Sequence, residues 1–461
     1  MVLNDYLVIS MFITFIGLLF TGFPIAWVLG GTGILFTLIG YCSDLWFNTM
    51  TGLSYLTLSM AVVRIFNTMS NWVLVALPMF IFMGFMLDRS GIAEKMMKSM
   101  QELFGKTRGG LAVTVTLIGI ILAASTGIIG ASVVLLGLLS LPAMMKQGYY
   151  LPLALGTIAG AGTLGILIPP SIMLVIMADQ LSLSVGDLFM GALIPGLVLG
   201  GFYILYIFVL GLVSPEKAPI AGDRRPLEIR MVLDVLKTIL PPALLILTVL
   251  GSIFAGIATP TEASGVGTLG ATLLARANKK INFKVLGEVM EFSFLTTAYI
   301  FAIFIGATVF ALVMRSLGGD ELIGRGLAHI PFSRYGVMAV ILGTVFFLGF
   351  FLDWIEITLI VLPLIVPAIS GLGFDLSQFQ GLDKPELLWF VVLVAVTLQT
   401  SFLTPPVGLA LFYLKGVCPP EVRTIDIYKG VVPFILLQLL CLAMLMAWPE
   451  LVLWLPSVVY G

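Results

Sequence analysis

The sequence has little charge, histidine or cysteine. Of its 461 residues only 10% are charged, and it contains one histidine and three cysteines. Soluble proteins carry about 25% charged residues, so a chain that is 60% hydrophobic cannot cover a soluble fold of this size with polar surface. The isolated cysteines and the single His329 exclude a disulfide framework and a conventional zinc site. A net charge of -1, without a long basic run, gives no support for a nucleic-acid partner.

Long apolar stretches are what the sequence has in abundance. Segments of roughly 17 to 30 nearly uncharged residues follow one another, and each can cross a hydrocarbon layer of about 30 Å as a helix. The sequence therefore predicts an all-α polytopic membrane protein embedded in a lipid bilayer. The N-terminal residues Met-Val-Leu-Asn-Asp-Tyr lack the basic region of a signal peptide, so we expect the first stretch to be retained as a crossing.

The basic residues set the predicted topology, because Lys and Arg concentrate in cytoplasmic loops. All of them except Arg64, Arg315, Arg325, Arg334 and Lys384 can be placed on one side. Both termini then face outward. The predicted crossings are 6–22, 24–40, 71–87, 151–180, 187–213, 238–258, 261–275, 289–314, 387–414 and 430–459.

Two apolar stretches do not fit as crossings. Residues 110–146 begin and end on the basic side, and residues 336–372 begin and end on the other side. We predict that both are re-entrant helical hairpins, which enter the membrane from opposite faces. Irregular backbone at this depth must be buried in protein or line a wet cavity, because lipid cannot satisfy its amides and carbonyls.

The chain also contains an internal repeat. Pro169-Pro170 recurs as Pro405-Pro406 (405 − 169 = 236), and Pro24 recurs as Pro260 at the same interval (260 − 24 = 236). The first copy begins outside and the second inside, so we predict two inverted-topology repeats, an arrangement typical of secondary transporters. The predicted division is a first repeat at 1–213, a cytoplasmic linker at 214–237 and a second repeat at 238–461.

The paired prolines interrupt two long crossings, 151–180 and 387–414. Proline removes an amide donor and disfavours helical geometry in the residue before it, so each crossing should be a broken helix. Freed carbonyls and hydroxyls suit a small hard cation such as Na⁺, and the positive ends of half-helices suit a carboxylate. The alternative is that each proline pair only kinks a packed helix. Two breaks at equivalent places of the repeat favour a binding role over this alternative. The candidate ion- or substrate-binding residues here are Gly162, Thr163, Gly165, Pro169, Pro170, Ser171, Gln399, Thr400, Ser401, Thr404, Pro405, Pro406 and Gly408.

The tip of the first hairpin supplies further candidates: Ser125, Thr126, Gly127, Gly130 and Ser132. Their small size would let backbone approach a ligand, and their hydroxyls could bind it. Alternatively, the serines and threonine only cap helix ends.

The tip of the second hairpin carries two acidic residues, Asp353 and Glu356. Their spacing is that of a capping box, in which Asp353 begins a helix and Glu356 reaches back to it. Acidic side chains deep in a membrane are rare, however, and mark ion paths by default. Both residues are therefore candidate ion ligands.

Four motifs together resemble a known family. They are Gly162-Thr-Leu-Gly-Ile-Leu-Ile-Pro-Pro-Ser171, Leu403-Thr-Pro-Pro-Val-Gly408, Ala258-Thr-Pro-Thr-Glu-Ala263 and Leu348-Gly-Phe-Phe-Leu-Asp353. Nearly the whole chain is similar to the large membrane subunit of TRAP (tripartite ATP-independent periplasmic) transporters. The resemblance implies a Na⁺-coupled, elevator-type importer in the bacterial inner membrane. It also implies a small four-helix membrane subunit, a periplasmic substrate-binding protein and a small carboxylate substrate, such as a C4-dicarboxylate or 2-oxo acid.

One departure from the family and two alternatives qualify this prediction. Many family members have a Ser-Gly-Ser-Ser-like first hairpin tip, which this chain lacks, and the difference suggests a smaller or more apolar acid. A stand-alone ion-coupled carboxylate or anion permease, working without a binding protein, is the alternative within transport. We find no nucleophile elbow, no His-based catalytic set and no phosphate-binding loop, so the sequence predicts neither an enzyme nor an ATP-driven pump.

Overall fold

The computed structural model describes residues 3–104, 107–126, 129–220 and 229–460. Throughout these ranges the regular elements are helices, and none is a strand. Eight of the described helices are long and apolar enough to cross a membrane. The predicted all-α membrane class is confirmed.

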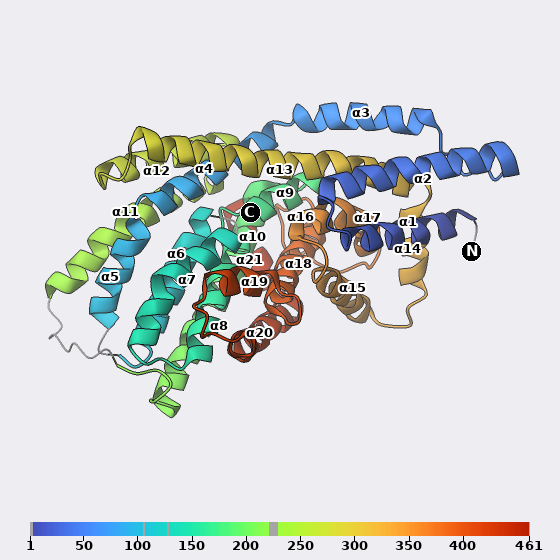
Figure 1. Ribbon diagram of the computed structural model, residues 1–461. Helices are drawn as coiled ribbons and strands as arrows, with labels where there is room; N and C mark the ends of the chain where they lie inside the picture. The colour runs from blue at the N-terminus through green and yellow to red at the C-terminus, as the bar shows by residue number, and fades with distance from the viewer. Residues whose placement is uncertain (1–2, 105–106, 127–128, 221–228, 461) are drawn as a thin grey trace.

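The first half of the chain forms a series of short and long helices (Figure 1). Its elements are α1 (Leu3–Leu19), α2 (Ile25–Phe47), α3 (Tyr55–Met69), η1 (Trp72–Val75), α4 (Ala76–Arg89), α5 (Ile92–Phe104), α6 (Gly110–Thr126), α7 (Ile129–Lys146), α8 (Leu151–Thr163), η2 (Leu164–Ile166), α9 (Ile172–Gln180) and α10 (Val185–Val213).

The second half has a similar order, with α13 occupying the place of both α3 and α4. Its elements are α11 (Ile229–Phe254), α12 (Pro260–Ala277), α13 (Phe283–Ser316), α14 (Gly319–Ala328), α15 (Arg334–Leu348), α16 (Trp354–Glu356), η3 (Ile357–Val361), α17 (Leu362–Ser370), α18 (Pro385–Leu403), α19 (Leu409–Val417), α20 (Thr424–Ala447) and α21 (Glu450–Tyr460).

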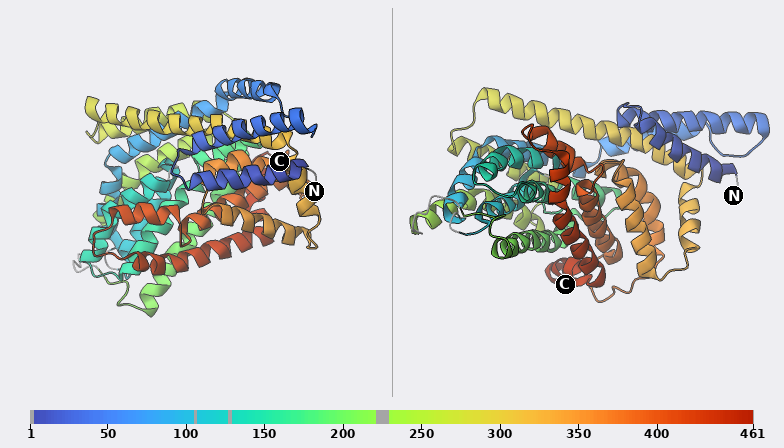
Figure 2. Two further views of the ribbon diagram at one scale, coloured as in Figure 1. Left: turned by 45° about the vertical axis from the view of Figure 1, so that its right-hand side comes forward. Right: turned by 60° about the horizontal axis from the view of Figure 1, so that its bottom comes forward.

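Long helices from both halves pack side by side along one edge of the molecule, where α2 lies against α13 and α12 against α4 (Figures 1 and 2). Glycines allow the close approach of α2 and α13. A Cβ on Gly306 would lie 2.4 Å from the carbonyl oxygen of Ala26, and a Cβ on Gly33 would lie 3.2 Å from the backbone nitrogen of Phe310. Such small-residue contacts are how helices associate where lipid gives no hydrophobic driving force.

The broken helices form the interior. Every described side chain of α18 from Leu387 to Leu403 is buried, and α8 is buried in the same way from Pro152 onward. α20 lies against α8, where a Cβ on Gly156 would lie 2.0 Å from the carbonyl oxygen of Gly430. The helices that lead into both predicted breaks therefore lie in the protein interior.

The structure differs from two predicted boundaries. The last predicted crossing, 430–459, is two helices, because Pro449 follows α20 and cannot continue its hydrogen-bond pattern. The predicted linker at 214–237 is shorter than expected, because α11 already begins at Ile229.

Candidate functional site

The first break lies between α8 and α9. Helix α8 ends at Thr163, the turn η2 follows, and α9 begins only at Ile172, after the cis peptide bond between Pro169 and Pro170. The Ser171 hydroxyl donates a hydrogen bond to the carbonyl of Ile166 at 2.8 Å. This bond closes the interrupted segment, and all of its residues are buried.

The second break lies between α18 and α19 and repeats this arrangement. It contains the cis peptide bond between Pro405 and Pro406, and α19 starts after Gly408, whose φ of +45° lies in the left-handed region. The Thr404 hydroxyl donates to the carbonyl of Thr400 at 2.7 Å. Unlike the first break, this one is partly open, because Pro406 is exposed. Both predicted helix breaks are present.

A direct hydrogen bond joins the two broken helices. Nε2 of Gln399 in α18 donates to Oγ1 of Thr163 in α8 at 3.3 Å, and both side chains are buried. The two residues are 236 positions apart, which is the interval of the sequence repeat. Oε1 of Gln399 has no hydrogen-bond partner among the described residues. A buried carbonyl-type oxygen without a donor is a ready ligand for a cation.

Other predicted polar residues at the breaks serve the helices themselves. The hydroxyl of Thr400 donates to the carbonyl of Val396 within α18. Ser401 instead bonds across to the first helix of the second hairpin, because its hydroxyl donates to the carbonyl of Phe346 in α15 at 2.9 Å. Ser401 is thus a link between a break and a hairpin.

The first hairpin consists of α6 and α7, which contact each other. Gly127 lies outside the described residues, as do the side chains of Ser125 and Thr126, although both belong to α6. The ring of Tyr413 in α19 closes over Gly130, where a Cβ would lie 3.0 Å from Cζ. The first hairpin tip therefore contacts the half-helix that follows the second break. Gly162 makes a similar contact with α7, since a Cβ there would lie 2.5 Å from Cγ2 of Val133.

The second hairpin consists of α15 followed by α16, η3 and α17. Asp353 accepts a hydrogen bond from the backbone nitrogen of Trp354 at 2.8 Å and so begins α16. Glu356 is fully buried, and neither of its carboxylate oxygens has a hydrogen-bond partner among the described residues, although the backbone amides of Asp353 and Glu356 lie nearby. The full capping box is therefore not formed, because Asp353 bonds to the next amide instead of the third.

The backbone beside Glu356 is irregular as well. The segment Ile357–Val361 is a π-helical turn, a geometry that occurs mostly as single-turn insertions at functional sites. The hairpin tip packs against α9, the half-helix that follows the first break. Each hairpin therefore contacts the short helix that follows the break in the opposite half of the chain, α7 with α19 and the second hairpin tip with α9.

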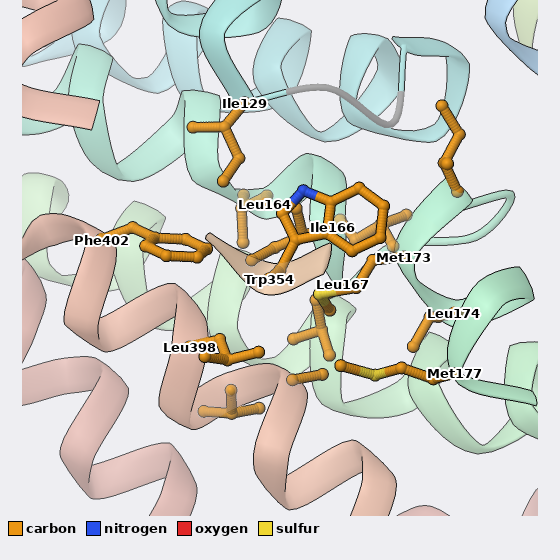
Figure 3. Packing of buried hydrophobic residues seen from close by; sticks show 14 of the residues in the cluster. Ile129, Leu164, Ile166, Leu167, Met173, Leu174, Met177, Trp354, Leu398 and Phe402 are labelled. Atoms are coloured by element: carbon orange, nitrogen blue, oxygen red, sulfur yellow. The ribbon is translucent and has the colours of Figure 1, made fainter. Parts of the chain in front are cut away.

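Trp354 is the centre of the apolar packing at this junction. Figure 3 shows it among Ile129 of α7, Leu164 of the first break and Phe402 of α18, all of them buried. Side chains from both hairpins and both broken helices thus form one cluster. This apolar surround lowers the local dielectric, which strengthens any interaction between an ion and the few polar groups present.

Comparison with known proteins identifies the family. Residues 12–451 match the DctM family, described as the DctM component of the tripartite ATP-independent periplasmic transporter. The chain belongs to this family.

The DctM-family chain is similar to large permease subunits along its whole length. It is 29% identical to the C4-dicarboxylate TRAP transporter large permease protein DctM of Vibrio cholerae, covering 98% of each chain. It is 25% identical to the sialic acid TRAP transporter large permease protein SiaM of the same species, covering 97% of each. Among solved structures, the Alcanivorax borkumensis YdaH transporter is similar in fold, with a TM-score of 0.59 at 12% identity, over 85% of this chain and 89% of that one.

Local chemistry explains one of the motifs that carry the family resemblance of this large TRAP subunit. In Ala258–Ala263 the hydroxyl of Thr259 accepts from the backbone nitrogen of Glu262 at 3.3 Å, and Oε2 of Glu262 accepts from the backbone nitrogen of Thr259 at 2.8 Å. The motif is a capping box that begins α12. Its role is therefore to start a helix, away from the breaks.

Two residues near the second hairpin tip were not predicted from the sequence. Tyr299 of α13 lies close enough to Asp353 and Glu356 to interact with both electrostatically, and Tyr413 of α19 does so with Asp353. A tyrosine pairs an apolar ring with a polar hydroxyl, so its presence inside an apolar crossing was the available signal.

Proposed function

We propose that this TRAP large subunit is a secondary active, Na⁺-coupled importer of an organic acid in the bacterial inner membrane. In this proposal a periplasmic binding protein delivers the acid, and the helices that carry the breaks and hairpins move as an elevator against the α2–α13 and α4–α12 layers. One observation carries it: the two broken helices are hydrogen-bonded to each other through Gln399 and Thr163, and the hairpin tip that packs against α9 carries Glu356, whose buried carboxylate oxygens have no hydrogen-bond partner among the described residues.

The unpaired polar oxygens support binding of a cation. A buried carboxylate without a partner costs several kcal/mol and must be neutralised by a proton or a positive ion. Oε1 of Gln399 in α18 and both oxygens of Glu356 in α16 are buried acceptors that have no hydrogen-bond partner within the described part of the chain. Among the described residues, no three or more His, Cys, Asp or Glu side chains lie close enough together to hold a metal ion. Oxygen ligands of low total charge suit Na⁺ better than a transition metal.

The names of the relatives support an organic acid as the substrate. They include permeases for C4-dicarboxylate, sialic acid and isethionate. We propose a small carboxylate for this chain, because half-helix ends at the breaks favour a negative group.

The isethionate relative is relevant to a second proposed partner, a small membrane subunit. Its permease protein is named DctMQ, and this chain covers only 56% of its length. We propose that this large subunit works with a small four-helix membrane subunit.

Uptake into proteoliposomes tests the proposal. The large subunit, its small subunit and the binding protein would be reconstituted together, and uptake of labelled succinate, isethionate and N-acetylneuraminate would be followed with inward Na⁺ or choline gradients. One net positive charge supplies about 2.3 kcal/mol per 100 mV, enough for roughly 40-fold accumulation. We expect accumulation only with Na⁺ and only with the binding protein. Uptake that persists in choline would disprove the coupling, and uptake without the binding protein would establish a stand-alone permease.

A further inference from the structure

A polar cavity of about 330 Å³ lies away from the helix breaks. It is lined by residues of helices α3 and α13 together with Gln180 at the end of α9, Leu359 of η3 and Pro363 of α17. Small-molecule sites begin at about 300 Å³, so the cavity has room for a small organic anion. Its polar lining residues are Arg64, Asn67, Thr68, Gln180, Thr308 and Arg315.

The cavity carries two positive charges and no negative one among its lining residues. Arg64 and Arg315 are exposed and take part in none of the ion pairs found among the described residues. Arg315 donates one long hydrogen bond, to the carbonyl of Pro363 at 3.4 Å. A guanidinium has five N–H donors in a planar fork that matches a carboxylate or a phosphate. Most donors of both arginines therefore remain available to an oxyanion.

The repeat makes this excess of positive charge more informative. Arg89 is the last residue of α4 in the first half and is followed by Ser90, and Arg315-Ser316 ends α13 at the corresponding place in the order of elements of the second half. Arg89 is neutralised by Glu288 from the early part of α13, at 3.1 Å between Nη1 and Oε2. The early part of α13 corresponds to α3 in the order of elements, and α3 supplies another arginine, Arg64, instead of an acid. Arg315 of the second half therefore has Arg64 near it at the place where Arg89 of the first half is paired with Glu288.

The predicted topology places both arginines outside, against the usual distribution of basic residues. The cavity also lies between α3 and α13 of the edge layers and the short helices attached to the breaks and hairpins. Movement of the second group against the first would open or close it. An anion held there would therefore respond to the proposed elevator motion.

We propose that this cavity is an oxyanion site, in which Arg64 and Arg315 hold the carboxylate of the organic acid before it reaches the helix breaks. The inference rests on the proposed function for the identity of the acid. The phosphate of an anionic lipid has similar chemistry and is the second possible source of the oxyanion.

Protection from an arginine-selective reagent tests the site. The full chain in phosphatidylcholine nanodiscs, free of Na⁺, would be treated with phenylglyoxal, and modification of each arginine would be measured by peptide mass spectrometry. Succinate, isethionate and N-acetylneuraminate are the probes, and succinamide is the neutral control. Arg334 is the internal reference, because it is exposed and donates to the carbonyl of Gly373 at 2.8 Å away from the cavity.

We expect at least one acid to protect Arg64 and Arg315 together, with Arg334 unprotected and succinamide without effect. In Arg64→Gln, the concentration that protects Arg315 should rise about tenfold or more, the loss expected for one charge-assisted hydrogen bond. Arg315→Lys keeps the charge but loses the planar fork of donors. In this variant the concentration of acid that protects Arg64 should rise by a smaller factor. Equal protection in wild type and Arg64→Gln would overturn the proposal.

Two further outcomes separate the possible ligands and the two proposals. Protection by phosphatidylglycerol nanodiscs, with no effect of any acid, would assign the cavity to lipid and overturn the carboxylate site. Failure of every acid to protect would overturn it too, even if Na⁺-dependent uptake is observed. Conversely, protection without Na⁺-dependent uptake would support this site and reject the coupling, because the labelling requires neither Na⁺ nor a gradient.

Discussion

Glu356→Gln should remove about half or more of the Na⁺ dependence of the protein's thermal stability. Glutamine keeps nearly the same volume at a fully buried position but carries no charge, so the packing around Trp354 should be preserved. In the absence of Na⁺ the variant should be at least as stable as wild type, because a buried neutral amide costs less than an unpaired buried carboxylate.

The size of the effect follows from ligand linkage. Na⁺ at about 100 times its dissociation constant stabilises the wild-type fold by about 2.7 kcal/mol. A bond to a charged group contributes about 1.5–3 kcal/mol, so loss of the Glu356 charge should weaken Na⁺ binding roughly tenfold or more. At the same Na⁺ concentration the stabilisation then falls to about 1.4 kcal/mol or less.

The assay is an apparent melting temperature in detergent, measured with NaCl or choline chloride at constant ionic strength. Glu450→Gln is the matched control, because Glu450 is exposed and interacts only weakly with Gln378, at 3.4 Å. The control should keep the full Na⁺ shift. If Glu356→Gln also keeps it, Glu356 is not a cation ligand, and a permanently protonated side chain becomes the better explanation of its burial.

Three further predictions concern the breaks and the interior packing. Thr163→Val leaves the buried amide donor of Gln399 unpaired and should lower the free energy of unfolding by about 1–3 kcal/mol. Thr163→Val and Thr404→Val should each weaken the Na⁺ activation of uptake. Unchanged activation in both variants would show that these hydroxyls only pack. Gly156→Ala should abolish a monodisperse peak in size-exclusion chromatography, because its Cβ would lie 2.0 Å from a carbonyl oxygen of α20, whereas Gly201→Ala has open space and should behave as wild type. Gly408→Ala should lower the melting temperature by the equivalent of about 1–2 kcal/mol, since its φ is +45°, and an unchanged value would mean that the turn relaxes.

Local signals predicted the helix breaks well. Pro169-Pro170 and Pro405-Pro406 remove amide donors wherever they occur, so the interruptions follow from the residues themselves. The capping interpretation of Asp353 and Glu356 was only half correct. Asp353 does begin a helix, but its carboxylate accepts a hydrogen bond from the next amide, that of Trp354, and not from the amide at the third position.

Composition and local chemistry determined the membrane class, the apolar helices and the places where they break, because these depend on residues within a few positions of one another. Only the tertiary structure decided which oxygens are left unpaired. The Gln399–Thr163 bond, the ring of Tyr413 over Gly130 and the cavity with Arg64 bring together segments far apart in the chain. Such contacts depend on how whole helices pack against one another. A pattern of neighbouring residues carries no information about that packing.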